Sequence, residues 1–174
     1  MTEPLPPQIV HVDDAPKAER RVGPHWGAEF QQLTPFLRAR GGRLGINRMR
    51  LAPHSGAVPF HAHRREDEAF VILEGRGVFR YGDEPLREVR AGDCISCPAG
   101  TGVAHQLANP FDEDLVYLAI GTHDPDEVCT YPDTGKVLVR GIGQVGRLTP
   151  TEYMDGEGDR PRALELFDGE RHGD

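Results

Sequence analysis

The stretch that decides the fold is residues 56–75, GAVPFHAHRREDEAFVILEG, and its chemistry lies in His61, His63 and Glu68. His61 and His63 are two residues apart, so on a strand both imidazoles point to the same face. Glu68 follows His63 at an odd offset, which on an unbroken strand would send its carboxylate to the opposite face. The fully charged segment 64–67 predicts a turn or bulge that restores the register. We therefore expect all three side chains to share one face.

His105 is a fourth candidate ligand, placed after the turn-forming residues Pro98 and Gly100. Three imidazoles and a carboxylate suit one divalent transition metal ion such as iron, manganese, zinc or nickel, and the absence of a thiolate argues against a closed structural zinc site. On an octahedral ion, four protein ligands leave two adjacent positions for a substrate. A polar barrel interior that binds an organic ligand without metal is the alternative interpretation.

Short strands separated by glycine or proline turns surround these residues. Residues 44–51 alternate, with Met49 and Leu51 on one face and Arg48 and Arg50 on the other. About eight short strands at this spacing predict an all-β barrel or sandwich. The expected strands are 44–51, 58–63, 68–73, 78–81, 86–89, 94–97, 103–107 and 115–120.

The flanks have weaker patterns. Residues 1–24 predict an extended or partly disordered arm with one short strand at 8–12, and 25–122 predict the barrel domain, which begins with a strand and a turn at Thr34-Pro35. Residues 123–150 predict an irregular extension that packs on the barrel, with a strand at 137–139. The acidic, glycine-rich residues 151–174 predict a weakly ordered tail.

Composition excludes several classes of protein. The 174 residues carry 28 acidic and 20 basic side chains, a net charge of −8 that argues against nucleic acid or an anionic membrane as a partner. No apolar run is long enough to span a bilayer, and the first residues do not look like a signal peptide. Three cysteines form no disulfide framework, so we expect a cytoplasmic protein.

Two groups of these residues resemble the two motifs of the cupin superfamily, over roughly residues 40–122. The first group resembles the first motif at every spacing, and the second departs only in having four residues, 101–104, before its histidine where two are usual. The resemblance implies a cupin double-stranded β-helix, or jelly-roll barrel, with an extended N-terminal arm and an irregular C-terminal extension. It also implies that His61, His63, Glu68 and His105 are metal ligands. The matching residues are Gly56, His61, His63, Glu68 and Gly75, then Gly92, Pro98, Gly100, His105 and Asn109.

The cupin fold hosts many activities, so the resemblance leaves the function open. The first hypothesis is a metalloenzyme acting on a small polar organic molecule. Dioxygenase-like chemistry is preferred to a metal-dependent isomerase, lyase or decarboxylase on a sugar or small acid, because imidazole-rich open sites suit ferrous iron. The alternative class is a non-enzymatic cupin that binds a sugar or small metabolite. We also expect a homodimer in which residues 1–30 extend a sheet edge of the partner.

A few further residues are candidates for contact with the substrate, namely Arg48, Arg50, Phe70, Arg80 and Tyr117. For the arginines the competing interpretation is a solvated outer face, and for the two aromatic residues it is core packing. The Cys94-x-x-Cys97 pair is interpreted as structural, because a three-residue offset on a strand sends its thiols to opposite faces. Asn109 is expected to satisfy a turn.

Overall fold

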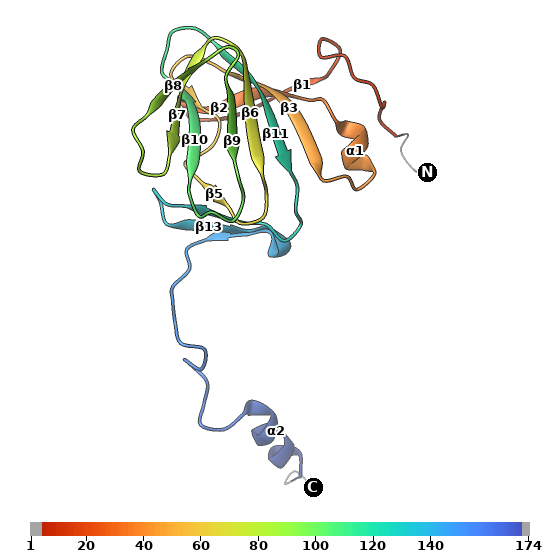
Figure 1. The fold of residues 1–174 in the computed structure, drawn as a ribbon. Helices are drawn as coiled ribbons and strands as arrows, with labels where there is room; N and C mark the ends of the chain where they lie inside the picture. The colour runs from red at the N-terminus through yellow and green to blue at the C-terminus, as the bar shows by residue number, and fades with distance from the viewer. Residues whose placement is uncertain (1–4, 172–174) are drawn as a thin grey trace.

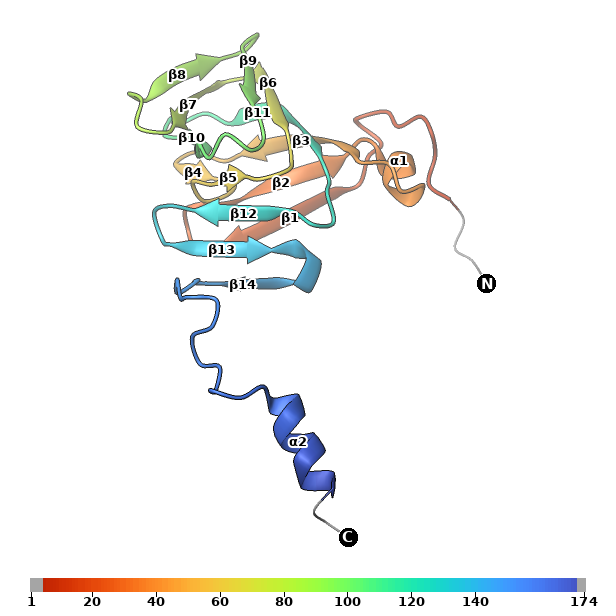
Figure 2. The same ribbon diagram turned by 60° about the horizontal axis from the view of Figure 1, so that its bottom comes forward.

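The computed structural model describes residues 5–171, and strands dominate it. A ten-stranded sheet in the order β8-β7-β10-β4-β2-β3-β11-β6-β9, with β1 on β2, curls into the barrel (Figure 1). A second, four-stranded sheet has the order β14-β13-β12-β5 (Figure 2). The strands are β1 (Lys17–Val22), β2 (Trp26–Gln32), β3 (Leu44–Leu51), β4 (Ser55–Gly56), β5 (Ala62–His63), β6 (Glu68–Glu74), β7 (Arg76–Tyr81), β8 (Arg87–Arg90), β9 (Cys94–Cys97), β10 (His105–Asn109), β11 (Leu115–Thr122), β12 (Val128–Tyr131), β13 (Lys136–Val139) and β14 (Gln144–Gly146).

Period-two alternation explains which side chains form the barrel core. On β3, Met49 and Leu51 face the core and Leu51 is fully buried, as the alternation predicts. The central strand β11 pairs antiparallel with both β3 and β6 along most of its length. The buried core comprises Ala28, Leu51, Phe70, Ile72, Phe79, Val89, Cys97, Leu107, Leu115 and Tyr117. The all-β cupin barrel expected from the motifs is thereby confirmed.

The N-terminal region differs from the sequence-based expectation in two ways. Residues 8–12 form no strand; the first strand is β1, which pairs with β2 of the same chain. The buried Gln31 amide holds the arm by donating to the carbonyl oxygens of Val12 and Ala15. The turn expected at Thr34-Pro35 is instead the start of helix α1 (Pro35–Ala39), because proline at the first helical position has the φ that a helix needs. The expected homodimer stays a prediction.

The C-terminal extension also differs from expectation. The strand predicted at 137–139 is confirmed as β13, but the rest of residues 123–150 is more regular than expected. β12 forms a hairpin with β13, and the short 3-10 helix η1 (Arg140–Ile142) and β14 follow. The hairpin joins the barrel by pairing β12 with β5 and lies across one end of it (Figures 1 and 2). Beyond β14 the chain leads away from the barrel to helix α2 (Arg162–Arg171).

The helices are short. Within residues 5–171, none is both long and apolar enough to cross a membrane.

Candidate metal centre

Strand ends bring the four predicted ligands together at the end of the barrel that the β12–β13 hairpin covers. His63 ends β5, Glu68 begins β6 and His105 begins β10. His61, immediately before β5, is paired with His105 by two backbone hydrogen bonds, N to O at 3.1 Å and 2.7 Å. Residues 64–67 form the expected break between the strands, so Glu68 returns to the face of the two earlier histidines.

The donor atoms converge on a common point. One ligand atom from each of His61, His63, Glu68 and His105 lies within 4.8 Å of every other. The Nε2 atoms of His61 and His63 are 3.1 Å apart, and Nε2 of His105 is 2.9 Å from Oε2 of Glu68. The same Glu68 oxygen is 3.5 Å from His63 Nε2 and 3.7 Å from His61 Nε2. An ion bound about 2.1 Å from each donor sets neighbouring donors about 3 Å apart, so the spacing suits a metal ion.

The hydrogen bonds of the Nδ1 atoms of His61 and His63 determine which nitrogen of each ring is available to bind a metal ion. Nδ1 of His61 donates to the Pro59 carbonyl oxygen at 2.8 Å, and Nδ1 of His63 donates to Oε1 of Glu127 at 3.2 Å. Both acceptors lack a proton, so both Nδ1 atoms carry one, and in the neutral imidazole that binds a metal each Nε2 atom then presents its lone pair. Two lone pairs facing each other beside a carboxylate repel unless a cation lies among them. The donor set therefore fits a divalent metal ion.

Burial and charge act together on the ligands. The His105 side chain is 3% exposed whereas Glu68 is 25% exposed, so solvent reaches the cluster from the side of Glu68. Burial alone raises the pKa of Glu68, but its contacts with the imidazoles of His105, His61 and His63 outweigh burial and hold that pKa far below its usual range. Burial is also the main reason that the pKa of His105 is lowered, which favours the neutral imidazole a metal needs.

Aromatic rings form the walls next to the cluster. The ring centroid of Phe70 is 6.0 Å from that of His105 and 5.7 Å from that of Tyr117. Phe79 and Tyr131, which the sequence reasoning did not select, lie 6.4 Å from His105 and 6.1 Å from His61. Phe70 and Tyr117 belong to the buried core, as the competing interpretation of core packing expects, and their contact with a substrate stays a prediction.

The three predicted arginines are not brought to the cluster. Arg48 contacts Gln31 and Glu74, Arg50 pairs with Asp114, and Arg80 pairs with Asp133 while stacking on Phe60. On their strands they alternate with core residues such as Met49 and Phe79, so they lie on the outer face. The competing interpretation, outward-facing arginines, is the one the structure matches.

The β12–β13 hairpin contributes the residues that the sequence reasoning missed. Glu127, Cys129 and Tyr131 alternate along the chain, and Cys129 stands opposite His63 in the pairing of β12 with β5. The signal that could have revealed them is the alternation in 127–131 followed by the turn-forming Asp133-Thr134-Gly135. Glu127, which directly precedes β12, is fully buried and contacts His63.

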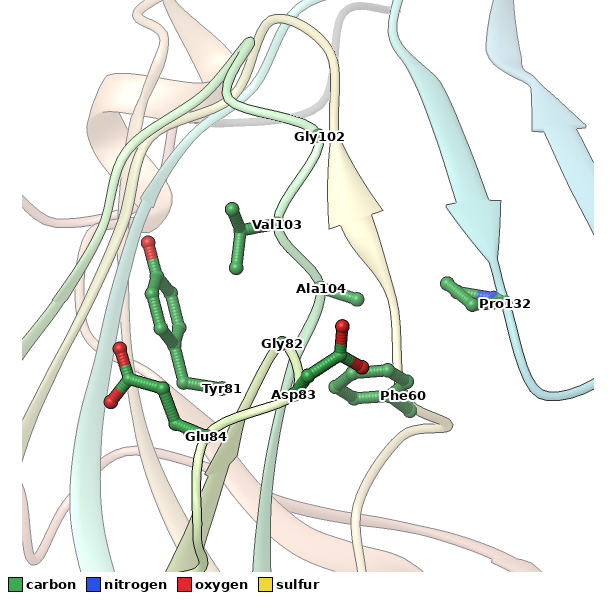
Figure 3. Close-up of a pocket in the computed structure, with 9 residues that line it drawn as sticks. All are labelled: Phe60, Tyr81, Gly82, Asp83, Glu84, Gly102, Val103, Ala104 and Pro132. Carbon is green, nitrogen blue, oxygen red and sulfur yellow. The ribbon is translucent and has the colours of Figure 1, made fainter.

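A hollow of about 610 Å³ opens beside the centre (Figure 3). Its lining includes Phe60 and Ala104, the residues immediately before two of the ligands, and the acidic Asp83 and Glu84. None of the four ligands lines it, and its two carboxylates disfavour an anion. We therefore do not identify it with the metal centre.

The thiols near the centre are expected to be unreactive in the folded protein. Burial raises the pKa of Cys97 to about 12 and that of Cys129 to about 11, whereas Cys94 is exposed. Very little thiolate forms at either buried site at pH 8, so neither thiol is expected to react. Titration with a disulfide reagent should give one reactive thiol in the native protein and three in denaturant. Three fast-reacting thiols without denaturant would contradict the burial of this region.

Comparison with known proteins gives the same family. Residues 47–121 match the model of the cupin domain. A curated relative, the uncharacterized protein YdbB of Bacillus subtilis (strain 168), is 34% identical over 53 residues, 30% of this chain and 47% of that protein. The match therefore spans about half of the length of that relative.

Two solved structures extend the likeness beyond the motifs. The crystal structure of a sugar phosphate isomerase from a cupin superfamily, from Silicibacter pomeroyi DSS-3, has a TM-score of 0.68 and 26% identity over 84% of this chain and 98% of that chain. A predicted oxalate decarboxylase from Thermotoga maritima has a TM-score of 0.57 and 25% identity over 67% of this chain and 99% of that chain. Residues 47–121 are a cupin domain, and the chain carries a His/Glu cluster that could hold a metal ion.

Proposed function

We propose that this cupin is a metal-dependent enzyme acting on a small polar organic molecule. The observation that carries the proposal is the convergence of three imidazole Nε2 atoms and one carboxylate oxygen within 4.8 Å. His61, His63, Glu68 and His105 would hold one divalent ion such as iron, manganese, zinc or nickel. The ion would supply Lewis-acid chemistry by polarising a substrate oxygen atom.

For the reaction, we propose an isomerase or decarboxylase conversion of a small sugar or organic acid. The two solved neighbours, one named a sugar phosphate isomerase and one a predicted oxalate decarboxylase, support this choice over dioxygenase-like chemistry. The dioxygenase preference from the sequence stays a prediction. Both substrate types carry adjacent oxygen atoms, which suit the two positions that four protein ligands leave open on an octahedral ion.

Tyr131 would help to hold such a substrate. Its ring stacks on that of His61, and burial raises its pKa above the usual value, so the phenol keeps its proton. A protonated phenol acts as a hydrogen-bond donor to a substrate oxygen. Lys136 lies across the ring of Tyr131, with Nζ 5.5 Å from the ring centroid, and provides a positive charge beside the site for an acidic group.

The test begins with protein stripped of metal and reloaded with iron, manganese, zinc or nickel separately. Each form is incubated with oxalate, small hydroxy and keto acids, and sugar phosphates, while product formation is followed by NMR and oxygen by an electrode. Metal-dependent turnover without oxygen consumption is the expected result. Oxygen consumption coupled to turnover would favour the dioxygenase instead, and tight binding of a metabolite without turnover would favour a non-enzymatic binding protein.

A further inference from the structure

Glu127 is a buried carboxylate whose partners all belong to the metal-binding segment. The residue is 0% exposed. Its Oε1 accepts hydrogen bonds from the backbone N–H of Arg64 at 2.8 Å and from Nδ1 of His63 at 3.2 Å, and its Oε2 accepts one from the backbone N–H of Arg65 at 2.8 Å. A buried charge without partners is costly, so these three donors explain how the carboxylate is tolerated.

Two of the three donors lie between the ligands His63 and Glu68, and the third is the imidazole of His63 itself. Arg64 and Arg65 belong to the short break that returns Glu68 to the face of the histidines. One carboxylate therefore holds both the orientation of an imidazole and the backbone turn on which the next ligand depends. Glu127 itself lies outside residues 47–121, the part of the chain that matches the cupin model.

A second ion at this place is not supported. Oxygen and nitrogen atoms of His63, Glu66 and Glu127 do lie close enough to hold one. However, both oxygens of Glu66 contact the Arg140 guanidinium, and Oε1 also accepts the backbone N–H of Asp124. Both carboxylates are already satisfied within the protein, so an ion would have to displace existing bonds.

We propose that Glu127 is a positioning residue of the metal centre. It holds His63 with the proton on Nδ1 and the Nε2 lone pair toward the ion, and it fixes the 64–67 turn that places Glu68. The proposal rests on the metal centre proposed above. Its consequence is that metal affinity depends on the C-terminal hairpin as well as on the barrel.

The test compares Glu127→Gln with Glu66→Gln as a matched control. Both substitutions remove one buried negative charge next to the same turn, but Oε2 of Glu66 is 3.7 Å from His63 Nδ1, too far for a hydrogen bond. Affinity for Zn²⁺ and Mn²⁺ is measured by competition with a chelator of known affinity, and thermal unfolding is followed without metal. We expect Glu127→Gln to weaken metal binding about 10–100-fold and Glu66→Gln, which loosens the same turn but keeps the hydrogen bond between Glu127 and His63, to weaken it clearly less.

The tautomer of His63 gives a readout independent of metal. In metal-free wild-type protein, long-range ¹H–¹⁵N NMR spectra should show His63 with its proton on Nδ1, and in Glu127→Gln a mixture of both tautomers. If Glu127→Gln does not fold, Glu127→Asp takes its place, because it keeps the charge but withdraws it from the imidazole.

Unchanged affinity and tautomer in the Glu127 variant, or equal losses in the Glu66 control, would overturn the proposal. Wild-type protein that binds no metal would overturn the proposed function instead, and the tautomer would still show whether Glu127 orients His63.

Discussion

Replacing Gly75 by alanine is expected to lower the free energy of unfolding by about 3–5 kcal/mol. Gly75 joins β6 to β7 with φ +77°, a conformation that L side chains rarely adopt. An added Cβ would also overlap the carbonyl oxygen of Asp114 and press on Leu115, which is fully buried at the start of β11. The backbone on both sides would have to move, and urea denaturation measures the loss.

Gly92→Ala is the matched control. Gly92 also has a positive φ, +95°, but a Cβ built there meets nothing within 4 Å. Only the conformational strain remains, and the expected loss is about 1 kcal/mol. Equal losses at both positions would show that contact with Asp114 and Leu115 contributes nothing and would contradict the packing described for the β6–β7 turn.

The second large effect is expected from Arg140→Ala, at about 3–5 kcal/mol. The guanidinium pairs with both oxygens of Glu66 and donates to the Asp124 carbonyl oxygen. The Glu66 side chain is only 6% exposed, so removing its partner leaves a buried charge with the backbone N–H of Asp124 as its remaining short contact. The Arg140–Glu66 pair connects η1 to the 64–67 turn. We therefore also expect faster hydrogen exchange in β12 and β13 of the Arg140 variant.

Arg80→Ala supplies the comparison for Arg140. Arg80 also makes two hydrogen bonds to one carboxylate, Asp133, but the two side chains are 36% and 50% exposed. Exposed pairs contribute little, and the stack on Phe60 adds a similar amount, so a loss of about 1 kcal/mol is expected. Chemical denaturation measures the free energy of unfolding of both variants. An Arg140 variant no less stable than the Arg80 variant would contradict the buried contacts described for Arg140 and Glu66.

Local patterns allowed much of the barrel to be predicted. The bounds of β3 and β9 coincide with the predicted 44–51 and 94–97, because alternation between glycine turns is a strong signal for a half-buried strand. The same alternation correctly placed Cys94 and Cys97 on opposite faces, and the structure leaves Cys94 exposed and Cys97 buried. Asn109 satisfies a turn as expected, with its amide donating to the carbonyl oxygens of Leu51, Ala52 and Glu113.

Features that depend on distant partners could not be predicted. Glu127 acts on residues more than sixty positions earlier, and the alternation in 127–131 indicates a strand but not which residues this carboxylate contacts. Of the β12–β13 hairpin only the strand at 137–139 was predicted, because a strand of four residues such as β12 gives little periodicity. Arg48, Arg50 and Arg80 could be assigned to the outer face only once the register was known, since a shift of one residue exchanges the two faces.

The most direct test of the account is elemental analysis of untagged protein beside the His61→Ala, His105→Ala double variant. The two imidazoles supply half of the proposed ligands, and their backbones remain able to form the bridge between residues 61 and 105. The account predicts close to one equivalent of a transition metal in the wild-type protein and its loss from a folded double variant. Wild-type protein that holds no metal and takes none up on reconstitution would contradict it.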